Sequence, residues 1–491
     1  MDLNPAVCYR AVQARDARYH GRFFTCVKTT GIYCRPICPA RPPKFENCQF
    51  VPTAAAAQEA AFRPCLRCRP ESSPTLHAWQ GTAATVSRAL KLIETGALDE
   101  GNVAALAERL GLGERQLRRL FSRHLGAAPI TVAQTRRVLL AKQLIHQTDL
   151  SMIDVALASG FGSVRRFNEA FQRLYQRPPS KLRNRTGTSP ASPEITLLLP
   201  YRPPYDWESM LRFLRVRAIA GLEIVTADTY SRAIALEDVV GSLQVRNSPE
   251  HASLEVTIRV PRLNVLPTII SRLRRQFDLG AEPVAIDAAL SADPLLAPLV
   301  QARPGLRVPG GWDGFEIAVR AILGQQITLT AATKLVTRLV NSLGQDEAEQ
   351  VAIPGLTHLF PGPECFHVEE IVSLGMPAAR AQSLVGVAQA AVADKRLFDP
   401  RSDLAATVEH FQQLPGIGEW TAQYIAMRAL GESDAFLAGD VALQRQLAAD
   451  GTRPSAHQVL ERAEQWRPWR AYANLHLWMA DADAQQPAFV H

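Results

Sequence analysis

The cysteines of this chain are concentrated near one end, since seven of the eight lie within the first 68 residues. Among them stand two close pairs, Cys34-Arg-Pro-Ile-Cys38 and Cys65-Leu-Arg-Cys68. The N-terminal segment lacks the apolar core of a signal peptide, which disfavours secretion and a disulfide framework. Two close pairs of thiolates can converge on one tetrahedral zinc ion. The spacing therefore favours a zinc site over reduced cysteines that never meet.

Charge is distributed as unevenly as the cysteines. Residues 1–185 hold 28 Lys and Arg against 13 Asp and Glu, a net charge of +15. Residues 186–491 hold 26 against 34, a net charge of −8. A strongly basic segment predicts binding to a polyanion. No apolar run approaches the roughly twenty residues of a membrane-spanning helix, so we expect a cytoplasmic protein with no membrane partner.

A longer string around the cysteine pairs carries a resemblance. FFTCVKTTGIYCRPICPARPPKFENCQFV, followed by AAFRPCLRCRP, resembles the zinc-binding domain of Ada-type methylphosphotriester DNA methyltransferases over about residues 5–72. This implies that Cys34, Cys38, Cys65 and Cys68 hold zinc and that Cys34 accepts the methyl group. Zinc keeps a thiol deprotonated, and only a thiolate is a good nucleophile. Methyl transfer would be stoichiometric, and the lost negative charge should strengthen DNA binding.

Basic residues near these cysteines are candidate phosphate contacts, although a solvated basic surface would look the same. They are Arg35, Arg41, Lys44, Arg63, Arg67 and Arg69.

Residues 85–183 show a helical pattern that repeats after about fifty residues. In the first copy, VAALAERLGLGERQLRRLFSRHLGAAP, one helix ends at Gly111 and the next places Leu117, Leu120 and Phe121 on one face. In the second copy, IDVALASGFGSVRRFNEAFQRLYQRPP, the turn is Gly-Phe-Gly. A helix, a tight turn and a basic helix form the geometry of major-groove readers, although a generic helical bundle shares this pattern.

The tandem arrangement resembles the AraC-type regulator domain. This resemblance implies promoter DNA as a partner, with RNA polymerase as a further candidate. It places candidate DNA-contacting residues on the second helix of each copy, where most arginine contacts go to phosphate. These residues are Arg115, Gln116, Arg118 and Arg119 in the first copy, and Val164, Arg165, Arg166 and Asn168 in the second.

The chain changes character after this stretch. A segment rich in Ser, Thr, Pro and Gly predicts a linker. ITLLLP, ALEDVVGSLQVRN and HASLEVTIRV then alternate like strands, while MLRFLRVRAIA and VLPTIISRLRRQF have helical patterns. A small α+β domain is therefore expected over residues 195–285. From about residue 286 the pattern is helical to the end.

A glycine-containing turn lies within this last block, in LPGIGEWTAQYIAMRAL. It joins a helix that reaches Leu414 to one that begins near Glu419. Gly416 and Gly418 let the backbone approach a ligand closely, so amides at the new helix N-terminus can bind one DNA phosphate. Taken alone, the turn fits an ordinary interhelical connection, and Asp440, which follows it, fits a simple helix N-cap.

The motifs of this region together carry a second resemblance. YRPPYDWESMLRFL, GFEIAVRAILGQQIT, LPGIGEWTAQY, FLAGD and RPWRAYANLHLW occur in order between about residues 195 and 480. They resemble AlkA-type 3-methyladenine DNA glycosylases of the helix-hairpin-helix superfamily. The resemblance makes Asp440 the catalytic carboxylate. It also implies an aromatic base-binding cleft made by Trp420, Tyr424, Trp478 and Phe213, and a monovalent cation held by the carbonyls of Gln412, Leu414 and Ile417.

The chemistry follows from the leaving group. Alkylation puts positive charge on a purine and weakens its glycosidic bond, and an ionised Asp440 would stabilise the oxocarbenium-like sugar. The base must first leave the stack, and aromatic faces attract a cationic base. Trp420 stands where bifunctional relatives carry a lyase lysine, so we expect a monofunctional glycosylase. Gln326 stands where the family often has an apolar wedge, and Val441 replaces an aromatic found in some members.

The predicted fold is multidomain and mainly α with α+β parts. Its predicted regions are a small zinc domain (1–75), a tandem helix-turn-helix domain (82–184), a linker (185–194), a small α+β domain (195–285) and an all-α helix-hairpin-helix glycosylase domain (286–491).

The predicted function is DNA alkylation repair. The tail would excise alkylated bases from double-stranded DNA, the zinc-thiolate domain would accept methyl groups from methylphosphotriesters, and the helix-turn-helix domain would regulate the alkylation response. The expected setting is a bacterial cytoplasm, with the protein on the nucleoid. Two alternatives stay open, a transcriptional regulator with a vestigial glycosylase domain and a zinc-dependent binding protein without methyl transfer. No second active cysteine in a Pro-Cys-His-Arg setting is present, which gives no sign of an alkylguanine-repair domain.

Overall fold

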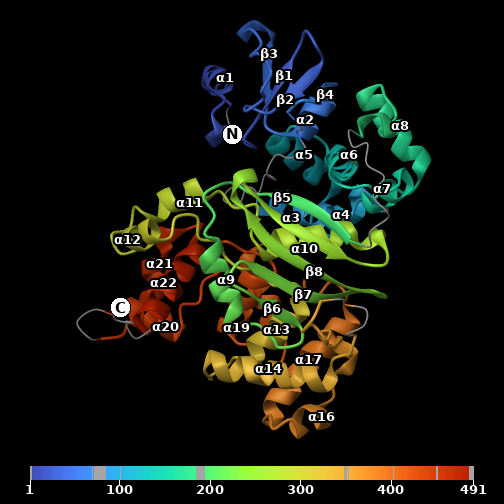
Figure 1. Cartoon of the computed structure of the whole chain (residues 1–491). Helices are drawn as coiled ribbons and strands as arrows, with labels where there is room; N and C mark the ends of the chain where they lie inside the picture. The colour runs from blue at the N-terminus through green and yellow to red at the C-terminus, as the bar shows by residue number, and fades with distance from the viewer. Residues whose placement is uncertain are drawn as a thin grey trace. The chain divides into compact units, whose positions relative to one another are not determined.

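The sequence patterns become helices and strands in a computed structural model (Figure 1). The residues that it describes are 3–68, 70, 84–99, 101–183, 194–347, 351, 353–401, 403–448 and 452–485. All but the last residue of the predicted linker, and also Arg69, lie outside the described residues. No helix among the described residues is long and apolar enough to cross a membrane.

The N-terminal segment folds as a small sheet with two helices. Its elements are α1 (Pro5–Ala14), β1 (Phe24–Val27), β2 (Ile32–Cys34), β3 (Cys48–Val51), α2 (Ala54–Glu59) and β4 (Arg63–Pro64). The strand order is β3-β1-β2-β4, with β2 and β4 parallel and the other pairs antiparallel. The side chains of Phe24, Cys26 and Tyr33 are buried against the alanines of α2, whose small size permits close packing on the sheet.

Six helices follow, and they confirm the predicted repeat. They are α3 (Ala84–Glu94), α4 (Val103–Arg109), α5 (Glu114–Leu125), α6 (Pro129–Gln147), α7 (Met152–Ala158) and α8 (Val164–Tyr175).

The two copies agree in detail. In α5 the buried residues are Leu117, Phe121 and Leu125, and in α8 the buried residues lie fifty positions later, at 167, 171 and 175. The turns before these helices contain Gly111 and Gly160, both with positive φ, at +68° and +84°. Since glycine adopts a positive φ with the least strain, the sequence specifies the same short turn twice.

Helix α6 packs against the N-terminal sheet module as well as against its helical neighbours. Thr135 Oγ1 donates to Gln58 Oε1 at 3.1 Å, and the fully buried Lys142 directs its Nζ at the carbonyl oxygen of Cys65, 3.5 Å away. The Lys142 ammonium also lies 5.5 Å from the ring centroid of Tyr175, at the end of α8. The cysteine-bearing loop and the helix-turn-helix repeat therefore share contacts through one helix.

The remaining strands form the second sheet, and all five lie within the predicted α+β region or one residue from it. They are β5 (Glu194–Pro200), β6 (Glu223–Val225), β7 (Thr229–Leu236), β8 (Val239–Ser248) and β9 (Ser253–Arg259), accompanied by α9 (Trp207–Arg215) and α10 (Leu266–Gln276). Strand β5 pairs antiparallel with β9, and β7 pairs antiparallel with both β6 and β8.

Every later element is helical, as predicted. The helices are α11 (Pro283–Leu290), α12 (Leu296–Ala302), α13 (Gly314–Leu323), α14 (Leu329–Leu343), α16 (Val368–Ser373), α17 (Ala378–Ala393), α18 (Leu404–Gln412), α19 (Glu419–Arg428), α20 (Val441–Gln446), α21 (Ala456–Ala463) and α22 (Arg470–Gln485). The expected boundary at residue 285 falls inside α11, because Pro283 begins that helix. The change from mixed to helical structure therefore comes earlier, after α10.

The chain divides into two compact units that are not consecutive in sequence. The first comprises Met1–Tyr201 and Ser253–Ser271, and the second comprises Arg202–Ala252 and Arg272–His491. In the second unit, α13, α17 and α19 contribute to one large apolar core, and α12 and α22 to another. These helices and the loops between them carry the candidate residues of the second unit.

Candidate functional site

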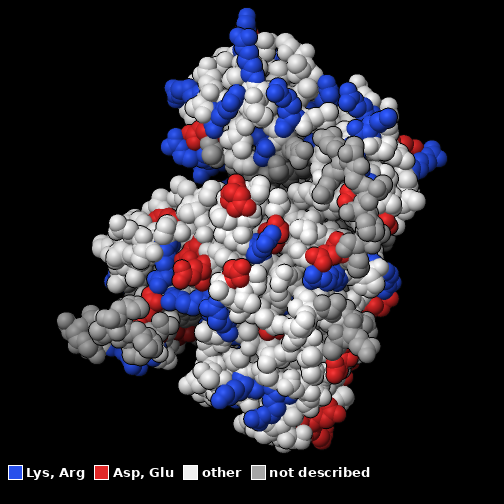
Figure 2. Space-filling model, in the orientation of Figure 1, with Lys and Arg blue, Asp and Glu red and all other residues white. Residues whose placement is uncertain are grey.

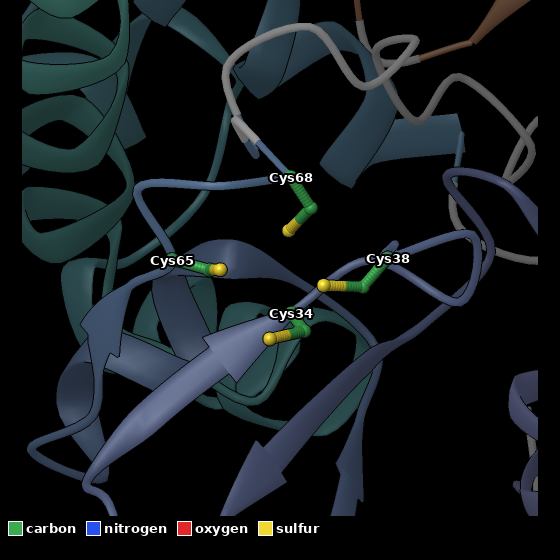
Figure 3. Close-up of side chains that lie close together, drawn as sticks. All are labelled: Cys34, Cys38, Cys65 and Cys68. Carbon is green, nitrogen blue, oxygen red and sulfur yellow. The ribbon is translucent and has the colours of Figure 1, made fainter. Parts of the chain in front are cut away.

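The four cysteines of the two close pairs converge. Figure 3 shows their side chains pointing toward one another, and their sulfur atoms all lie within 4.8 Å of each other. Cys34 ends β2 and Cys65 follows β4, so the parallel pairing of Tyr33 with Pro64 brings the two loops together. Thiolates at tetrahedral corners, about 2.3 Å from a zinc ion, stand roughly 3.8 Å apart. The donor set and its spacing therefore fit one zinc.

The surroundings of this thiol cluster distinguish its members. Cys34 is half-buried, whereas Cys38, Cys65 and Cys68 are buried. The backbone N–H of Arg35 donates to Cys68 Sγ at 3.4 Å. Hydrogen bonds among the thiols raise the pKa of Cys34 and lower the pKa of Cys65. Cys34 is therefore the one residue of the cluster that is not fully buried.

The other three N-terminal cysteines lie outside the cluster. Burial raises the pKa of the Cys26 thiol to about 12, and burial also raises the pKa of Cys8 and Cys48. Cys48 Sγ donates to the carbonyl of Lys44 at 3.3 Å. None of the three joins the four-cysteine group among the residues that the structure describes.

Basic side chains gather over the N-terminal sheet module and α8, with few acidic ones among them (Figure 2). Arg67, Arg41 and Lys44 are exposed. Arg35 is half-buried, and its Nη1 lies 3.0 Å from His20 Nε2. The sequence prediction of a basic face agrees with this surface.

The predicted DNA-contacting residues of α5 and α8 lie on exposed helix faces. Arg115, Arg119 and Arg166 are exposed. Arg118 pairs with Glu114 at 2.6 Å, and Arg165 pairs with Glu169 at 2.8 Å. Exposed ion pairs of this kind add little to stability, so either arginine can exchange its carboxylate for a phosphate.

The second group of candidate residues surrounds a cavity of about 1230 Å³ within the second unit. Asp440 is the N-cap of α20 and accepts from the backbone N–H of Ala442 at 2.9 Å. Its two oxygens also accept indole N–H groups, from Trp478 at 3.1 Å and from Trp420 at 3.2 Å. Asp440 is therefore a helix N-cap, and the same carboxylate also lines the cavity.

Aromatic residues line the cavity beside this carboxylate. Trp420 and Tyr424, one turn apart on α19, stack with ring centroids 5.2 Å apart and an interplanar angle of 14°. Trp478, from α22, lies with its ring centroid 6.4 Å from that of Tyr424. A flat, partly apolar wall therefore extends from the carboxylate into the cavity.

Phe213 differs from its predicted place in this wall. It is buried, it stacks on Trp478 with centroids 6.3 Å apart, and it is absent from the described lining of the cavity. The guanidinium carbons of Arg217 and Arg428 lie 3.6 and 4.7 Å from its ring centroid. Direct contact between Phe213 and a bound base is therefore not supported, because other side chains already cover the ring.

The hairpin between α18 and α19 has the expected form. Gly416 has φ +79°, and a Cβ there would lie 2.0 Å from Ser383 Oγ. A Cβ on Gly418 would meet no atom within 4 Å, which leaves room for a ligand at the start of α19. The carbonyl oxygen of Leu414 accepts from the N–H of Ile417 at 3.1 Å. Gln412 is the last residue of α18, so the three predicted cation-binding carbonyls flank one tight turn.

Gln326 lies in the loop between α13 and α14. It is exposed, lines the cavity and has φ +58°, a backbone conformation that is costly for residues other than glycine. The neighbouring Gln325 donates from Nε2 to the carbonyl of Gly416 at 3.0 Å and to Thr421 Oγ1 at 2.9 Å. This loop is therefore fastened to the hairpin at the cavity edge.

Comparison with known proteins places the chain in a family. Three domain descriptions match, namely the metal binding domain of Ada at residues 7–71, a helix-turn-helix domain at residues 106–185 and the AlkA N-terminal domain at residues 196–313. A Mycobacterium tuberculosis protein named probable bifunctional transcriptional activator/DNA repair enzyme AlkA is 39% identical over 477 residues, covering 96% of this chain and 95% of that protein. The chain belongs to the family of bifunctional transcriptional activator/DNA repair enzymes.

Other relatives match one half of this bifunctional protein each. DNA-3-methyladenine glycosylase 2 of Escherichia coli is 33% identical over 58% of this chain and 96% of its own length. The Escherichia coli bifunctional transcriptional activator/DNA repair enzyme Ada is 33% identical over 31% of this chain and 42% of its own length. The solved 3-methyladenine DNA glycosylase of Archaeoglobus fulgidus shares the fold, with a TM-score of 0.50 and 22% identity over 59% of this chain and 99% of that one.

Membership of this bifunctional family confirms the predicted multidomain fold and the pairing of repair with transcriptional regulation. The sequence prediction missed several cavity residues, however. Arg217 lies just beyond the matched segment YRPPYDWESMLRFL, and Gln325 lies inside GFEIAVRAILGQQIT. A charged or amide side chain in or beside these apolar motifs was the available signal. Their roles depend on contacts across many residues, which the spacing along the chain does not reveal.

Proposed function

We propose that this protein excises alkylated purines from double-stranded DNA by monofunctional N-glycosidic hydrolysis, with Asp440 as the catalytic carboxylate. The observation that carries the proposal is the place of Asp440 on the cavity wall, where two indole N–H groups fix the orientation of its oxygens. A carboxylate that is held in one position beside an aromatic wall can face the sugar carbon of an extruded nucleotide.

The geometry supports a simple sequence of events. The damaged base leaves the duplex and packs against Trp420, Tyr424 and Trp478, whose electron-rich faces favour a cationic purine. As the bond between C1′ and the base nitrogen breaks, its electron pair leaves with the base. The negative charge of Asp440 stabilises the positive charge that develops on the sugar. Water then adds to C1′ and releases one proton to Asp440 or to solvent. Trp420 offers no amine for a Schiff base.

Backbone groups of the hairpin would hold the DNA. The amides at the start of α19 face a position where Gly418 leaves space, and a helix N-terminus attracts phosphate. A monovalent cation on the carbonyls of Gln412, Leu414 and Ile417 would add positive charge at the same turn. Gln326 would fill the space that the extruded nucleotide leaves.

The thiol cluster supports methyl acceptance by Cys34. One bound zinc ion would keep the four sulfurs as thiolates. The Sγ of Cys34, the one half-buried residue of the cluster, would attack the methyl carbon of a DNA methylphosphotriester. A sulfur–carbon bond forms as the oxygen–carbon bond breaks, and the restored phosphodiester departs with the electron pair. The cluster loses one negative charge, which would raise its affinity for DNA.

The helix-turn-helix repeat would then direct the methylated protein to promoter DNA, where RNA polymerase is the expected partner. Candidate contacts are Arg35 and Arg67 beside the thiol cluster, and Arg115, Arg118, Arg119, Arg165 and Arg166 on the two exposed helices. The corresponding regions are the zinc domain at 1–75, the helix-turn-helix domain at 82–184 and the glycosylase at 195–491.

Base release tests the catalytic assignment. Asp440→Asn keeps an N-cap side chain but removes the charge, so release of 3-methyladenine from methylated duplex DNA should fall by about a hundredfold or more. Asp403→Asn is the matched control, because Asp403 caps α18 in the same way and is not among the described cavity residues. Unchanged release by Asp440→Asn would refute the assignment. No release by the wild-type protein would favour the regulator with a vestigial glycosylase.

Mass spectrometry tests the methyl acceptor. After incubation with DNA that carries methylphosphotriesters, the peptide containing Cys34 should gain one methyl group. Cys34→Ser should gain none, whereas Cys48→Ser, which alters a half-buried cysteine outside the cluster, should behave like the wild type. Failure of the wild-type protein to take up a methyl group would leave a zinc-dependent binding domain.

A further inference from the structure

Arg217 is a cavity residue that the proposed chemistry leaves without a role. It lies two residues beyond the end of α9 and lines the same cavity as Asp440 and Tyr424. Its guanidinium stacks on the ring of Phe213, and its Nη1 donates to the carbonyl of Phe213 at 3.2 Å. These contacts hold the planar group in one orientation.

The other arginines of the cavity differ from Arg217 in having their charge balanced or their donors in use. Arg232 pairs with Glu316 at 2.8 Å, Arg320 with Glu223 at 2.7 Å, and Arg445 with Asp481 at 2.6 Å. Arg428 donates to the carbonyls of Pro309 and Gly310 and to Tyr424 Oη.

Arg217 has no carboxylate partner among the residues that the structure describes. Burial, together with the nearby charge of Arg428, lowers the pKa of Arg217 to about 10, so it remains a cation at neutral pH. A guanidinium has five N–H donors and accepts no hydrogen bond. The two contacts to Phe213 and Tyr424 leave donors for a ligand in the cavity.

The contacts around Tyr424 relate Arg217 to the proposed reaction centre. Asp440 accepts a hydrogen bond from the indole N–H of Trp420, and Trp420 stacks on Tyr424. The hydroxyl of Tyr424 in turn lies against Arg217 and Arg428. Although burial alone would raise it, the charges of Arg428 and Arg217 lower the pKa of Tyr424. These contacts form a continuous run of cavity-lining side chains from Asp440 to Arg217.

We propose that Arg217 recognises the substituent at position 6 of the extruded purine and favours alkylated guanine over alkylated adenine. This inference rests on the proposed glycosylase function. The oxygen O6 of guanine accepts a hydrogen bond, whereas the amino group N6 of adenine is a donor. An arginine can donate a hydrogen bond to the guanine O6, whereas it faces a second donor at the adenine N6.

Charge alone does not account for such a preference. Both 7-methylguanine and 3-methyladenine are cationic as nucleotides in DNA, so the charge of Arg217 disfavours both to a similar degree. At position 6, 7-methylguanine has an acceptor oxygen, whereas 3-methyladenine has a donor amino group. Since methylation occupies N7 of the guanine, a single hydrogen bond to O6 is expected, and its loss should change selectivity by about tenfold.

Internal competition tests this role. The full-length, zinc-loaded protein is incubated with duplex DNA treated with a methylating agent, which contains both lesions, and the two released bases are quantified together. At low conversion, their ratio divided by the ratio of the two lesions in the DNA gives the relative kcat/KM. Arg217→Met keeps a long side chain on Phe213 but removes the donors. It should lower the ratio of 7-methylguanine to 3-methyladenine about tenfold.

Two further variants complete the test. Arg217→Lys keeps the charge but not the planar fork, and it should give an intermediate ratio, which also guards against a folding defect in the methionine variant. Arg215→Met is the matched control, because Arg215 is an exposed arginine of the same segment that donates to the carbonyl of Thr226. It should leave the ratio unchanged.

An unchanged ratio in Arg217→Met would overturn the inference. An equal fall in the release of both bases would overturn it too, since Arg217 would then only support Phe213. Release of neither base by the wild-type protein would instead overturn the proposed function, so the two failures are distinguishable.

Discussion

The thiol cluster and the Asp440 cavity differ in how the chain assembles them. The cluster takes its four ligands from residues 34–68, and two adjacent strand ends bring them together. The cavity takes its wall from α9 to α22, more than 250 residues apart, without any metal ligand set among the described residues. A local site depends on its ion for stability, whereas a site built from many helices depends on the packing of the whole unit.

Removal of zinc should affect the activities of the two sites more differently than any other change. A chelator should abolish methyl uptake by Cys34, because structural zinc contributes about 10 kcal/mol or more to the folding of small domains. Release of 3-methyladenine should persist, since Asp440 and its wall need no zinc. The measurement is methyl uptake and base release on the same sample. A parallel loss of both activities would contradict this separation.

Acid should weaken the unit that holds the cavity. His476 on α22 is buried, and burial followed by the charge of Arg303 lowers its pKa to about 4. The unfolded chain binds this proton near pH 6.5, whereas the folded chain does not. The contribution of His476 to the free energy of unfolding is therefore fully present above about pH 6.5. It falls by about 3 kcal/mol as the pH drops toward 4.

Tryptophan fluorescence can follow this acid effect. Six of the seven tryptophans belong to the second unit, so chemical unfolding monitored in this way reports on that unit. His476→Gln should reduce the dependence of unfolding free energy on pH. An identical dependence in the variant would assign the effect to other groups.

The two hairpin glycines should behave differently from each other. Gly416→Ala places a Cβ against Ser383 at positive φ and should destabilise the second unit by about 1–3 kcal/mol. Gly418→Ala meets no neighbour, so thermal unfolding should be unchanged while affinity for duplex DNA falls. Melting curves and DNA titrations check both. Equal melting temperatures for the two variants would contradict the structural distinction.

The smallest effect is expected at the surface of the helix-turn-helix repeat. Glu114→Gln frees Arg118, and because the pair is exposed, stability should change by less than about 1 kcal/mol. Promoter affinity should rise slightly as Arg118 turns to phosphate, and the salt dependence should steepen. Binding measured at several salt concentrations checks this. Weaker promoter binding would indicate that Glu114 itself positions a contact.

The sequence was most informative where a feature is local or repeated. The spacing of Cys34, Cys38, Cys65 and Cys68 predicted their convergence, because two short loops at neighbouring strand ends have few other arrangements. The helical repeat was equally clear, since buried residues recur after fifty positions in α5 and α8. Both depend on periodicity that can be counted along the chain.

The cavity was predicted less completely. Resemblance to a family identified Asp440, Trp420, Tyr424 and Trp478, and all four line it. The same reasoning put Phe213 against the base, but Arg217, four residues along the chain, and the sequence-distant Arg428 cover that ring. Which aromatic side chain faces a cavity and which supports it from behind depends on packing between helices far apart in sequence.

The order in which the chain visits its two units has a consequence for dissecting the protein. The backbone leaves the first unit after Tyr201, returns to it for Ser253–Ser271 and then leaves again. A cut in the predicted linker would leave β5 and β9 on the C-terminal fragment, together with the rest of the segment that matches the AlkA N-terminal domain. The fragment that carries the proposed glycosylase would keep all five strands of its sheet but lose the contacts that β5 makes with α6.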